Sequence, residues 1–213
     1  MAQNMTARPV LAEIGAAEAG ALRLARQAML VAVGVALLTA AAKLKLPLPP
    51  SPVPISMGTF AVLGIGAAYG PRLGLVTILA YMALGALGAD VFANSSATNS
   101  GLAYMMGGTG GYLLGYVLAT VALGLLARRG WDRSVAWMAL AMLIGNVIIY
   151  VPGLVWLHGI VAGGAFQPDA FATPLAQTLA WGLWPFLVGD ALKLALAALL
   201  LPLAWRIVGD ARA

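Results

Sequence analysis

Two ionisable residues, Asp190 and Lys193, lie within an otherwise apolar stretch of the sequence from Trp184 to Leu201. A charged side chain in hydrocarbon is costly, so such residues normally face a partner or a cavity. Their spacing of three places both side chains on one face of a helix. A carboxylate and an ammonium group held there can bind a polar ligand together. The alternative is an internal ion pair that joins packed helices, and we favour ligand binding.

Asn146 and Tyr150 form a second polar pair, four residues apart within another apolar stretch. That spacing also places both side chains on one helix face. An amide offers hydrogen-bond donors and acceptors, and a phenol offers a ring face and a hydroxyl. The pair can therefore contact a ligand, or it can make hydrogen bonds between helices, which is a common role for polar residues in membranes.

A glycine-rich segment, Gly107-Gly-Thr-Gly-Gly-Tyr112, precedes a third apolar stretch. Free backbone N–H groups at a helix N-terminus bind anions, and glycines let a ligand approach the main chain. Thr109, Gly110, Gly111 and Tyr112 are therefore candidate binding residues. The alternative is close helix packing through Gly111 and Gly115.

The composition defines the elements that must position these residues. Of 213 residues, 62% are hydrophobic and 9% are charged, which indicates an all-α integral membrane protein. The chain has no cysteine and one histidine, so we expect no thiolate or zinc site and no metal or other cofactor. It contains none of the familiar hydrolase motifs, so we do not expect an enzyme.

Six apolar stretches are predicted to cross the membrane, since a crossing helix needs roughly 20 residues. They are residues 27–46, 55–69, 72–89, 110–127, 135–157 and 183–205. We divide the chain into an N-terminal cytoplasmic or interfacial segment (1–26), a six-helix transmembrane domain (27–207) and a cytoplasmic tail (208–213).

The basic residues set the expected orientation and explain the net charge of +5 without nucleic acid as a partner. With six crossings, nine arginines fall on one side of the membrane, which predicts that this side and both termini are cytoplasmic. These residues are Arg8, Arg23, Arg26, Arg72, Arg128, Arg129, Arg133, Arg206 and Arg212.

The predicted outer loops are unusually long. Residues 89–109 and 158–182 are rich in Gly, Asn, Ser and Pro, and residues 46–54 form a stiff proline-rich segment. We expect these loops to cover a binding cavity that opens outward, with Asn94 as a further candidate ligand contact.

Small residues form a stripe on the first predicted span, where Ala28, Ala32 and Ala36 recur every four residues. Such a stripe allows another helix to approach closely. The periodicity does not say whether that helix belongs to this chain or to a partner.

Five segments in order along residues 27–205 resemble the BioY family, the biotin-specific substrate-binding (S) components of energy-coupling factor (ECF) transporters. They are Pro52-Val-Pro-Ile-Ser56, Gly70-Pro-Arg-Leu-Gly74 with Tyr81-Met-Ala-Leu-Gly85, Gly108-Thr-Gly-Gly-Tyr112, Gly145-Asn-Val-Ile-Ile-Tyr150 with Gly153-Leu-Val-Trp156, and Gly189-Asp-Ala-Leu-Lys193. The resemblance implies a six-helix S-component fold with biotin bound near the outer surface, contacted by Asp190 and Lys193 and walled in part by the glycine loop.

The same resemblance implies a protein of the bacterial cytoplasmic membrane that works with a transmembrane coupling subunit and two ATPase subunits. Ala28, Ala32 and Ala36 are then candidate partner contacts. In one assignment Lys193 meets the biotin carboxylate and Asn146 or Asn94 serves the ureido group. In the opposite assignment Asp190 accepts a ureido N–H. Two alternatives stay open: an S component for another small vitamin-like anion, and an intramembrane enzyme or maturation factor that uses Asp190 as an acid or base.

Overall fold

The structure, a computed structural model, describes residues 8–15 and 20–208. Its long helices, in chain order, are α1 (Ala21–Lys43), α2 (Gly58–Ala86), α4 (Gly110–Arg128), α5 (Val135–Ile160) and α7 (Leu187–Val208). The shorter elements are η1 (Leu11–Glu13), β1 (Lys45–Leu46), β2 (Ile55–Ser56), α3 (Gly101–Met105), η2 (Trp131–Arg133), η3 (Val161–Ala165), α6 (Pro174–Gly182) and η4 (Trp184–Phe186).

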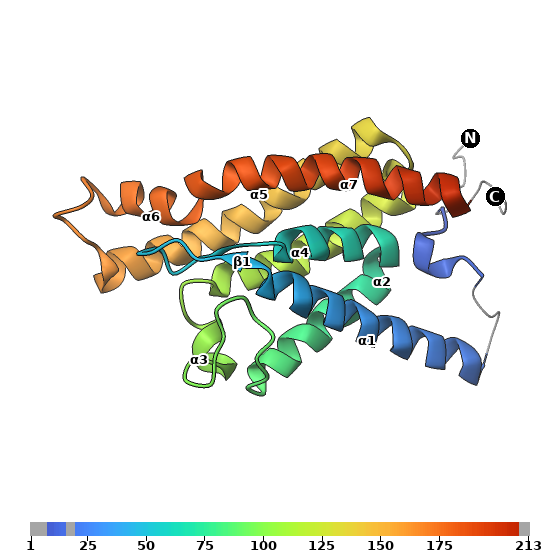
Figure 1. Ribbon diagram of the computed structural model, residues 1–213, viewed down its shortest axis with the longest axis horizontal. Coiled ribbons are helices and arrows are strands. Elements are labelled where there is room, and N and C mark those ends of the chain that lie inside the picture. The colour runs from blue at the N-terminus through green and yellow to red at the C-terminus, as the bar shows by residue number, and fades with distance from the viewer. Residues whose placement is uncertain (1–7, 16–19, 209–213) are drawn as a thin grey trace, which may run out of the picture.

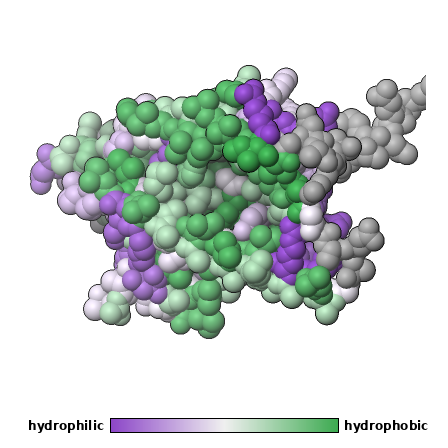
Figure 2. Space-filling view, turned by 45° about the vertical axis from the view of Figure 1, so that its right-hand side comes forward, coloured by the Kyte–Doolittle hydropathy of each residue, from purple (hydrophilic) through white to green (hydrophobic). Residues whose placement is uncertain are grey.

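Apolar length explains the main elements. Within the described residues, five helical stretches are long and apolar enough to cross a membrane: Ala21–Lys43, Gly58–Ala86, Gly110–Arg128, Val135–Ala165 and Pro174–Val208. Figure 2 shows hydrophobic residues across the middle of one face, which is hollowed at its centre, and hydrophilic residues toward its two ends. A mostly helical membrane protein is confirmed, although β1 and β2 add a short antiparallel ladder in which Lys45 lies opposite Ser56.

Helix α2 reverses direction at Gly70, as the Gly70-Pro71 pair predicts. Gly70 has φ 75° and ψ 177°, a backbone conformation that L side chains rarely adopt. The two segments, 58–69 and 71–86, then lie against each other, because a Cβ built on Gly74 would be 3.5 Å from the Cα of Gly66. The predicted second and third spans are thus the two arms of one broken helix.

Helix α4 lies at the centre of the bundle and packs against both α2 and α5, with α1 beside α2 and α7 beside α5 (Figure 1). Glycine allows the close contact between α4 and α5, since a Cβ on Gly115 would be 2.7 Å from the Cα of Ile149. Leu63, Leu123 and Met142 are fully buried in the core where α2, α4 and α5 meet.

Both described ends of the chain lie at one end of the bundle, here called the terminal end. The backbone N–H of Arg8 donates to the carbonyl of Arg128 at 3.0 Å, and Trp205 Nε1 donates to Asp132 Oδ2 at 2.6 Å. The strands β1 and β2 and the helices α3 and α6 lie at the opposite end, here called the loop end (Figure 1).

Several element boundaries differ from the sequence prediction. Helix α1 begins at Ala21 and ends at Lys43, whereas the predicted span was 27–46, because residues 45–46 pair with β2 instead of continuing the helix. The predicted outer loop 158–182 contains the end of α5, the π-helical turn η3 and helix α6. Thr173 caps α6, as its Oγ1 accepts from the N–H of Ala176 at 3.1 Å, and Pro174 follows at the first helical position.

Candidate functional site

A cavity of about 70 Å³ lies at the loop end, between α2, α4, α5 and α7 and beneath the chain segments that connect them. Its lining combines one acidic and one basic side chain with hydroxyl groups and many aromatic rings. These residues are Ala42, Val53, Pro54, Ser56, Thr59, Tyr81, Phe92, Ala93, Tyr104, Thr109, Tyr112, Leu113, Tyr116, Ile149, Tyr150, Phe186, Asp190 and Lys193.

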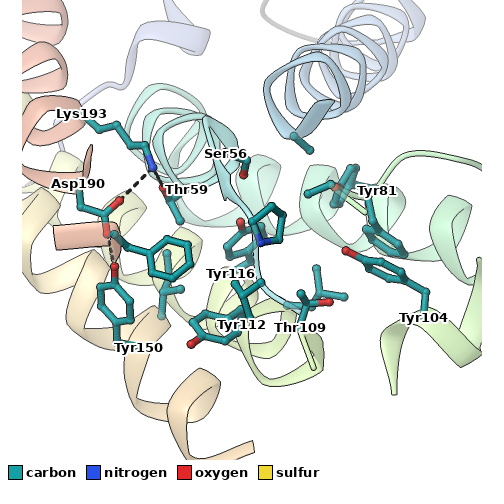
Figure 3. A pocket seen from close by; sticks show the side chains of 18 residues that line it. Ser56, Thr59, Tyr81, Tyr104, Thr109, Tyr112, Tyr116, Tyr150, Asp190 and Lys193 are labelled. Atoms are coloured by element: carbon teal, nitrogen blue, oxygen red, sulfur yellow. Dashed lines mark hydrogen bonds and ion pairs between the residues drawn. The ribbon is translucent and has the colours of Figure 1, made fainter. Parts of the chain in front are cut away.

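Asp190 and Lys193 line this cavity and also bind each other. Lys193 Nζ donates to Asp190 Oδ1 at 3.0 Å and to Thr59 Oγ1 at 3.2 Å. The hydroxyl of Tyr150 donates to the other carboxylate oxygen, Oδ2 of Asp190. Both charged residues are buried, at 6% and 8% exposure. Figure 3 shows the side chains of Tyr150 from α5 and of Asp190 and Lys193 from α7 converging.

This arrangement defines what the charged end can do. Each oxygen of Asp190 already accepts a hydrogen bond, so the carboxylate is held in place and its charge is balanced by Lys193. An ammonium group has three N–H donors, and Lys193 directs two of them to described residues. The third can donate to an oxygen of a ligand in the cavity.

Aromatic rings form the opposite end of the cavity. Phe92 stacks on Tyr104 with ring centroids 5.0 Å apart, and its edge meets Tyr81 at 5.2 Å. Figure 3 shows Tyr81 and Tyr104 on the far side of the cavity from Asp190 and Lys193. Gly85, one turn after Tyr81, leaves room for the Phe92 ring, which a Cβ there would approach to 2.1 Å. The cavity is therefore polar at one end and apolar at the other.

The tyrosine hydroxyls divide into two groups. Tyr81 donates to the carbonyl of Val91 at 3.0 Å, and Tyr112 donates to the carbonyl of Gly182 at 2.9 Å, so both hold covering segments in place. The hydroxyl of Tyr116 makes no hydrogen bond with any described residue, although it lies where a Cβ on Gly58 would be 3.0 Å away. It can bind a ligand without losing a partner.

The residues predicted from the glycine-rich segment separate into two sets. Thr109 and Tyr112 line the cavity. Gly111 faces α5 instead, because a Cβ there would be 2.3 Å from the carbonyl oxygen of Pro152. A Cβ on Gly110 would be 2.2 Å from the carbonyl oxygen of Met105 in α3 and 3.0 Å from the Trp156 ring. Their smallness permits helix packing at these positions.

The two predicted asparagines are not among the residues that line the cavity. Asn146 is buried in α5, about one turn below Tyr150. Asn94 joins the covering segments: its side chain accepts from Lys45 Nζ at 2.9 Å and donates to the carbonyl of Pro52 at 3.3 Å. Its backbone N–H donates to the Tyr104 hydroxyl at 3.2 Å.

An ion pair fastens the segment after α2 to the end of α1. Lys43 Nζ lies 2.5 Å from Asp90 Oδ1, which also accepts from the Ser95 hydroxyl at 2.7 Å. The hydrogen bond from Lys43, and to a smaller extent the one from Ser95, lowers the pKa of Asp90 below its ordinary value. The pair is exposed, so its contribution should weaken with salt.

Several lining residues were not predicted from the sequence, notably Ser56, Thr59, Tyr81, Tyr104 and Tyr116. One signal was available for Tyr116, since it lies four residues after Tyr112 and must share its helix face. Thr59 is brought to Lys193 only by packing of α2 against α7, which no local spacing reveals.

The alanines of the predicted stripe, Ala28, Ala32 and Ala36, are exposed on the outer face of α1. Among the described residues, no three His, Asp or Glu side chains converge, so we assign no metal ligands.

Comparison with known proteins identifies relatives of this chain. The family model of the BioY family matches residues 6–210. The probable biotin transporter BioY of Pyrococcus horikoshii is 36% identical over 66% of this chain and 74% of its own length, and the biotin transporter BioY of Thermotoga maritima is 33% identical over 62% and 68%. The crystal structure of the S-component for biotin from an ECF-type ABC transporter has the same fold, with a TM-score of 0.66 and 20% identity, covering 92% of this chain and 96% of that one.

Proposed function

The chain belongs to the BioY family, and from that premise we propose that it captures biotin for uptake across a membrane as the substrate-binding subunit of an ECF-type transporter. The observation that carries the proposal is the cavity at the loop end, where a buried acid–base pair faces an aromatic wall. Binding, and not turnover, is the proposed function, and it is supported by the hydrogen bonds that both oxygens of Asp190 already accept from Lys193 and Tyr150.

The chemistry of biotin suits the two ends of this cavity. Biotin combines an apolar bicycle with two polar ends, a ureido group and a carboxylate. The free N–H of Lys193 can donate to either a carboxylate oxygen or the ureido carbonyl. The rings of Tyr81, Phe92 and Tyr104 can cover the apolar parts of the ligand. Thr109, Tyr112 and Tyr150 complete the proposed contacts within the cavity.

We also keep Asn146, Gly110, Gly111 and Asn94 in the proposed site, in supporting positions. Gly111 sets the distance between α4 and α5, Gly110 leaves room for the end of α3, and Asn94 fastens the covering segments. Asn146 can reach the ligand only if the floor of the cavity rearranges, as it is not among the lining residues.

Titration calorimetry of the purified protein with biotin tests the proposal. We expect submicromolar affinity, weakened at least tenfold by Lys193→Ala or Asp190→Asn. Asp169→Asn, an exposed position at the loop end, is the matched control and should bind biotin as the unmodified chain does. Biotin indifference with tight binding of lipoate or thiamine would assign another vitamin, and chemical turnover of a substrate would favour the enzyme alternative.

A thermodynamic cycle identifies the ligand group at Lys193. If Lys193 meets the carboxylate, biotin methyl ester should bind more weakly than biotin, and Lys193→Ala should add little to that loss. If Lys193 meets the ureido carbonyl, the ester and the substitution should weaken binding independently, and their effects should add.

For the topology, we propose six crossings: α1, the two arms of α2, α4, α5 and α7. Support comes from the reversal at Gly70 and from the position of both described chain ends at the terminal end. The arginines of the terminal end favour a cytoplasmic location for it, so the cavity would face outward. The proposed division of the chain is an N-terminal segment (1–26), a transmembrane domain (27–207) and a C-terminal tail (208–213). We propose that the protein lies in a bacterial cytoplasmic membrane. Residues 1–7, 16–19 and 209–213 lie outside the described residues.

In this proposal the energy for uptake comes from partner subunits, because the given sequence shows no phosphate-binding motif of the Walker type. We propose a transmembrane coupling subunit with two ATPases, which docks on the exposed alanines of α1, Ala28, Ala32 and Ala36. Ala32→Leu should impair biotin uptake by cells while leaving biotin binding unchanged. Ala136→Leu makes the same change at an exposed position of α5 and is the control. Loss of binding, or normal uptake, would count against this contact.

A further inference from the structure

A second hollow, of about 630 Å³, lies at the terminal end of the molecule, between the segment of η1, α1 and the second arm of α2. Four guanidinium groups line it, from Arg23, Arg26, Arg72 and Arg128, together with one carboxylate from Glu13. Among the described lining residues, positive charge therefore exceeds negative charge by three. Basic residues are expected on a cytoplasmic side, but here four of them, from three separate elements, share one hollow.

Two of the four arginines are already engaged. Arg128 pairs with Glu13, and Arg26 Nη2 donates to the carbonyl of Ile14 at 2.7 Å. Arg23 and Arg72 are exposed and make no hydrogen bond or ion pair with any described residue. A planar guanidinium group binds phosphate oxygens through two parallel hydrogen bonds. The guanidinium groups of Arg23 and Arg72 therefore leave N–H donors available to a phosphate group in the hollow between α1 and α2.

The hollow continues into an apolar groove, which identifies the rest of the ligand. This groove, of about 650 Å³, runs between α1 and the second arm of α2. It shares Gln27, Leu73 and Val76 with the basic hollow. Beyond these residues its walls are aliphatic, including Val31, Ala80 and Leu84. A ligand that fits both parts carries a phosphate at one end and a hydrocarbon chain at the other.

We propose that this site binds an anionic phospholipid, with the headgroup phosphate between Arg23 and Arg72 and one acyl chain along the groove. Basic hollows between membrane helices can bind such headgroups. The arrangement matches, since the basic part lies at the terminal end and the groove runs from it along apolar residues of α1 and α2. The groove includes all three alanines of the proposed docking stripe, Ala28, Ala32 and Ala36, so the lipid chain would occupy this surface in the free subunit and would leave it when the coupling subunit docks.

Native mass spectrometry of the purified subunit tests the proposal. Phosphatidylglycerol and phosphatidylcholine with identical acyl chains are added in turn, and the retained lipid is counted. We expect phosphatidylglycerol to be retained preferentially. The double variant Arg23→Gln/Arg72→Gln should weaken this retention about tenfold. The double variant Arg129→Gln/Arg206→Gln removes the same charge from exposed positions outside the hollow and should change it less than twofold.

Other outcomes would overturn the proposal. Equal retention of the two lipids, or equal losses in both double variants, would reduce the hollow to diffuse surface charge. Displacement of phosphatidylglycerol by millimolar inorganic phosphate would show that a free anion and not a lipid is held. If Arg23→Gln/Arg72→Gln impaired only assembly with the coupling subunit, the hollow would serve an acidic protein segment. Biotin titration of the same samples reports separately on the cavity at the loop end.

Discussion

Removal of the Tyr116 hydroxyl should be simple to interpret, because this group lines the cavity and binds no described residue. We predict that Tyr116→Phe weakens biotin binding about threefold to tenfold, the usual effect of one lost hydrogen bond of about 1 kcal/mol. The melting temperature should stay unchanged, since no internal bond is broken. Calorimetry and thermal unfolding in the same detergent measure both quantities.

Tyr69 provides the opposite control. Its hydroxyl donates to the carbonyl of Leu30 at 3.0 Å, between α2 and α1 and away from the cavity. Tyr69→Phe should lower the melting temperature and leave biotin affinity intact. If Tyr116→Phe bound biotin normally, its hydroxyl would not contact the ligand.

Asp132 predicts how stability responds to pH. The side chain is 1% exposed, and burial raises its pKa from 3.8 to about 6, while the hydrogen bond from Trp205 and the charge of Arg133 act in the opposite direction. The folded state then holds this proton more tightly than the unfolded state does. The linked stability is present below pH 3.8, falls as pH rises toward about 6, and stays constant above it.

Asp132→Asn should remove this dependence, because the amide stays neutral and its oxygen can still accept from Trp205. We predict a gain of about 1–3 kcal/mol in unfolding free energy at pH 7.5, which disappears near pH 4. Thermal unfolding across this range measures it. Asp169→Asn, at an exposed position, should leave the pH profile unchanged; an identical profile for Asp132→Asn would mean that another group controls it.

At the level of elements, the contact between α4 and α5 depends on Gly115. A Cβ there would lie 2.7 Å from the Cα and 2.8 Å from the carbonyl oxygen of Ile149, so the two helices would have to separate. We predict that Gly115→Ala costs about 1–3 kcal/mol of stability, as overpacked cores do. It should also weaken biotin binding, since Ile149 lines the cavity.

Gly159→Ala is the matched control, because a Cβ at this position of α5 meets no heavy atom within 4 Å. Its expected effect is neutral or slightly stabilising, since alanine favours helix more than glycine does. Thermal unfolding of the two variants compares them directly. Equal melting temperatures would contradict the role of Gly115 in helix packing.

Elements were easier to predict than the direction of their side chains. Apolar length located the long helices, and Gly70-Pro71 located the reversal within α2, because these signals are local. Thr109 and Gly111 are only two residues apart, yet Thr109 faces the cavity and Gly111 faces α5. The rotation of α4 about its axis decides this, and it is set by packing against the other helices. The aromatic wall was missed because aromatic rings do not stand out in an apolar sequence. Asp190 and Lys193 were predicted because charged residues do stand out in an apolar sequence.

At the scale of the whole molecule, two features support the proposed orientation in the membrane. Both described chain ends lie at the terminal end, and the arginines of the α4–α5 turn lie there too, whereas the covering segments of the cavity lie at the loop end. Positive charge is retained on the cytoplasmic side. Asp169 is exposed at the loop end and Arg129 is exposed after α4, so these two positions should lie on opposite sides of the membrane.

The chain has no cysteine, so single cysteines can report this directly. We predict that Asp169→Cys reacts with a membrane-impermeant maleimide on intact cells. Arg129→Cys should react only after the cells are permeabilised, and both variants should bind biotin normally. The reverse pattern would place the cavity on the cytoplasmic side, where it could not capture biotin from outside. Labelling of both positions on intact cells would contradict an intact barrier between the two ends, and with it the proposed set of six crossings.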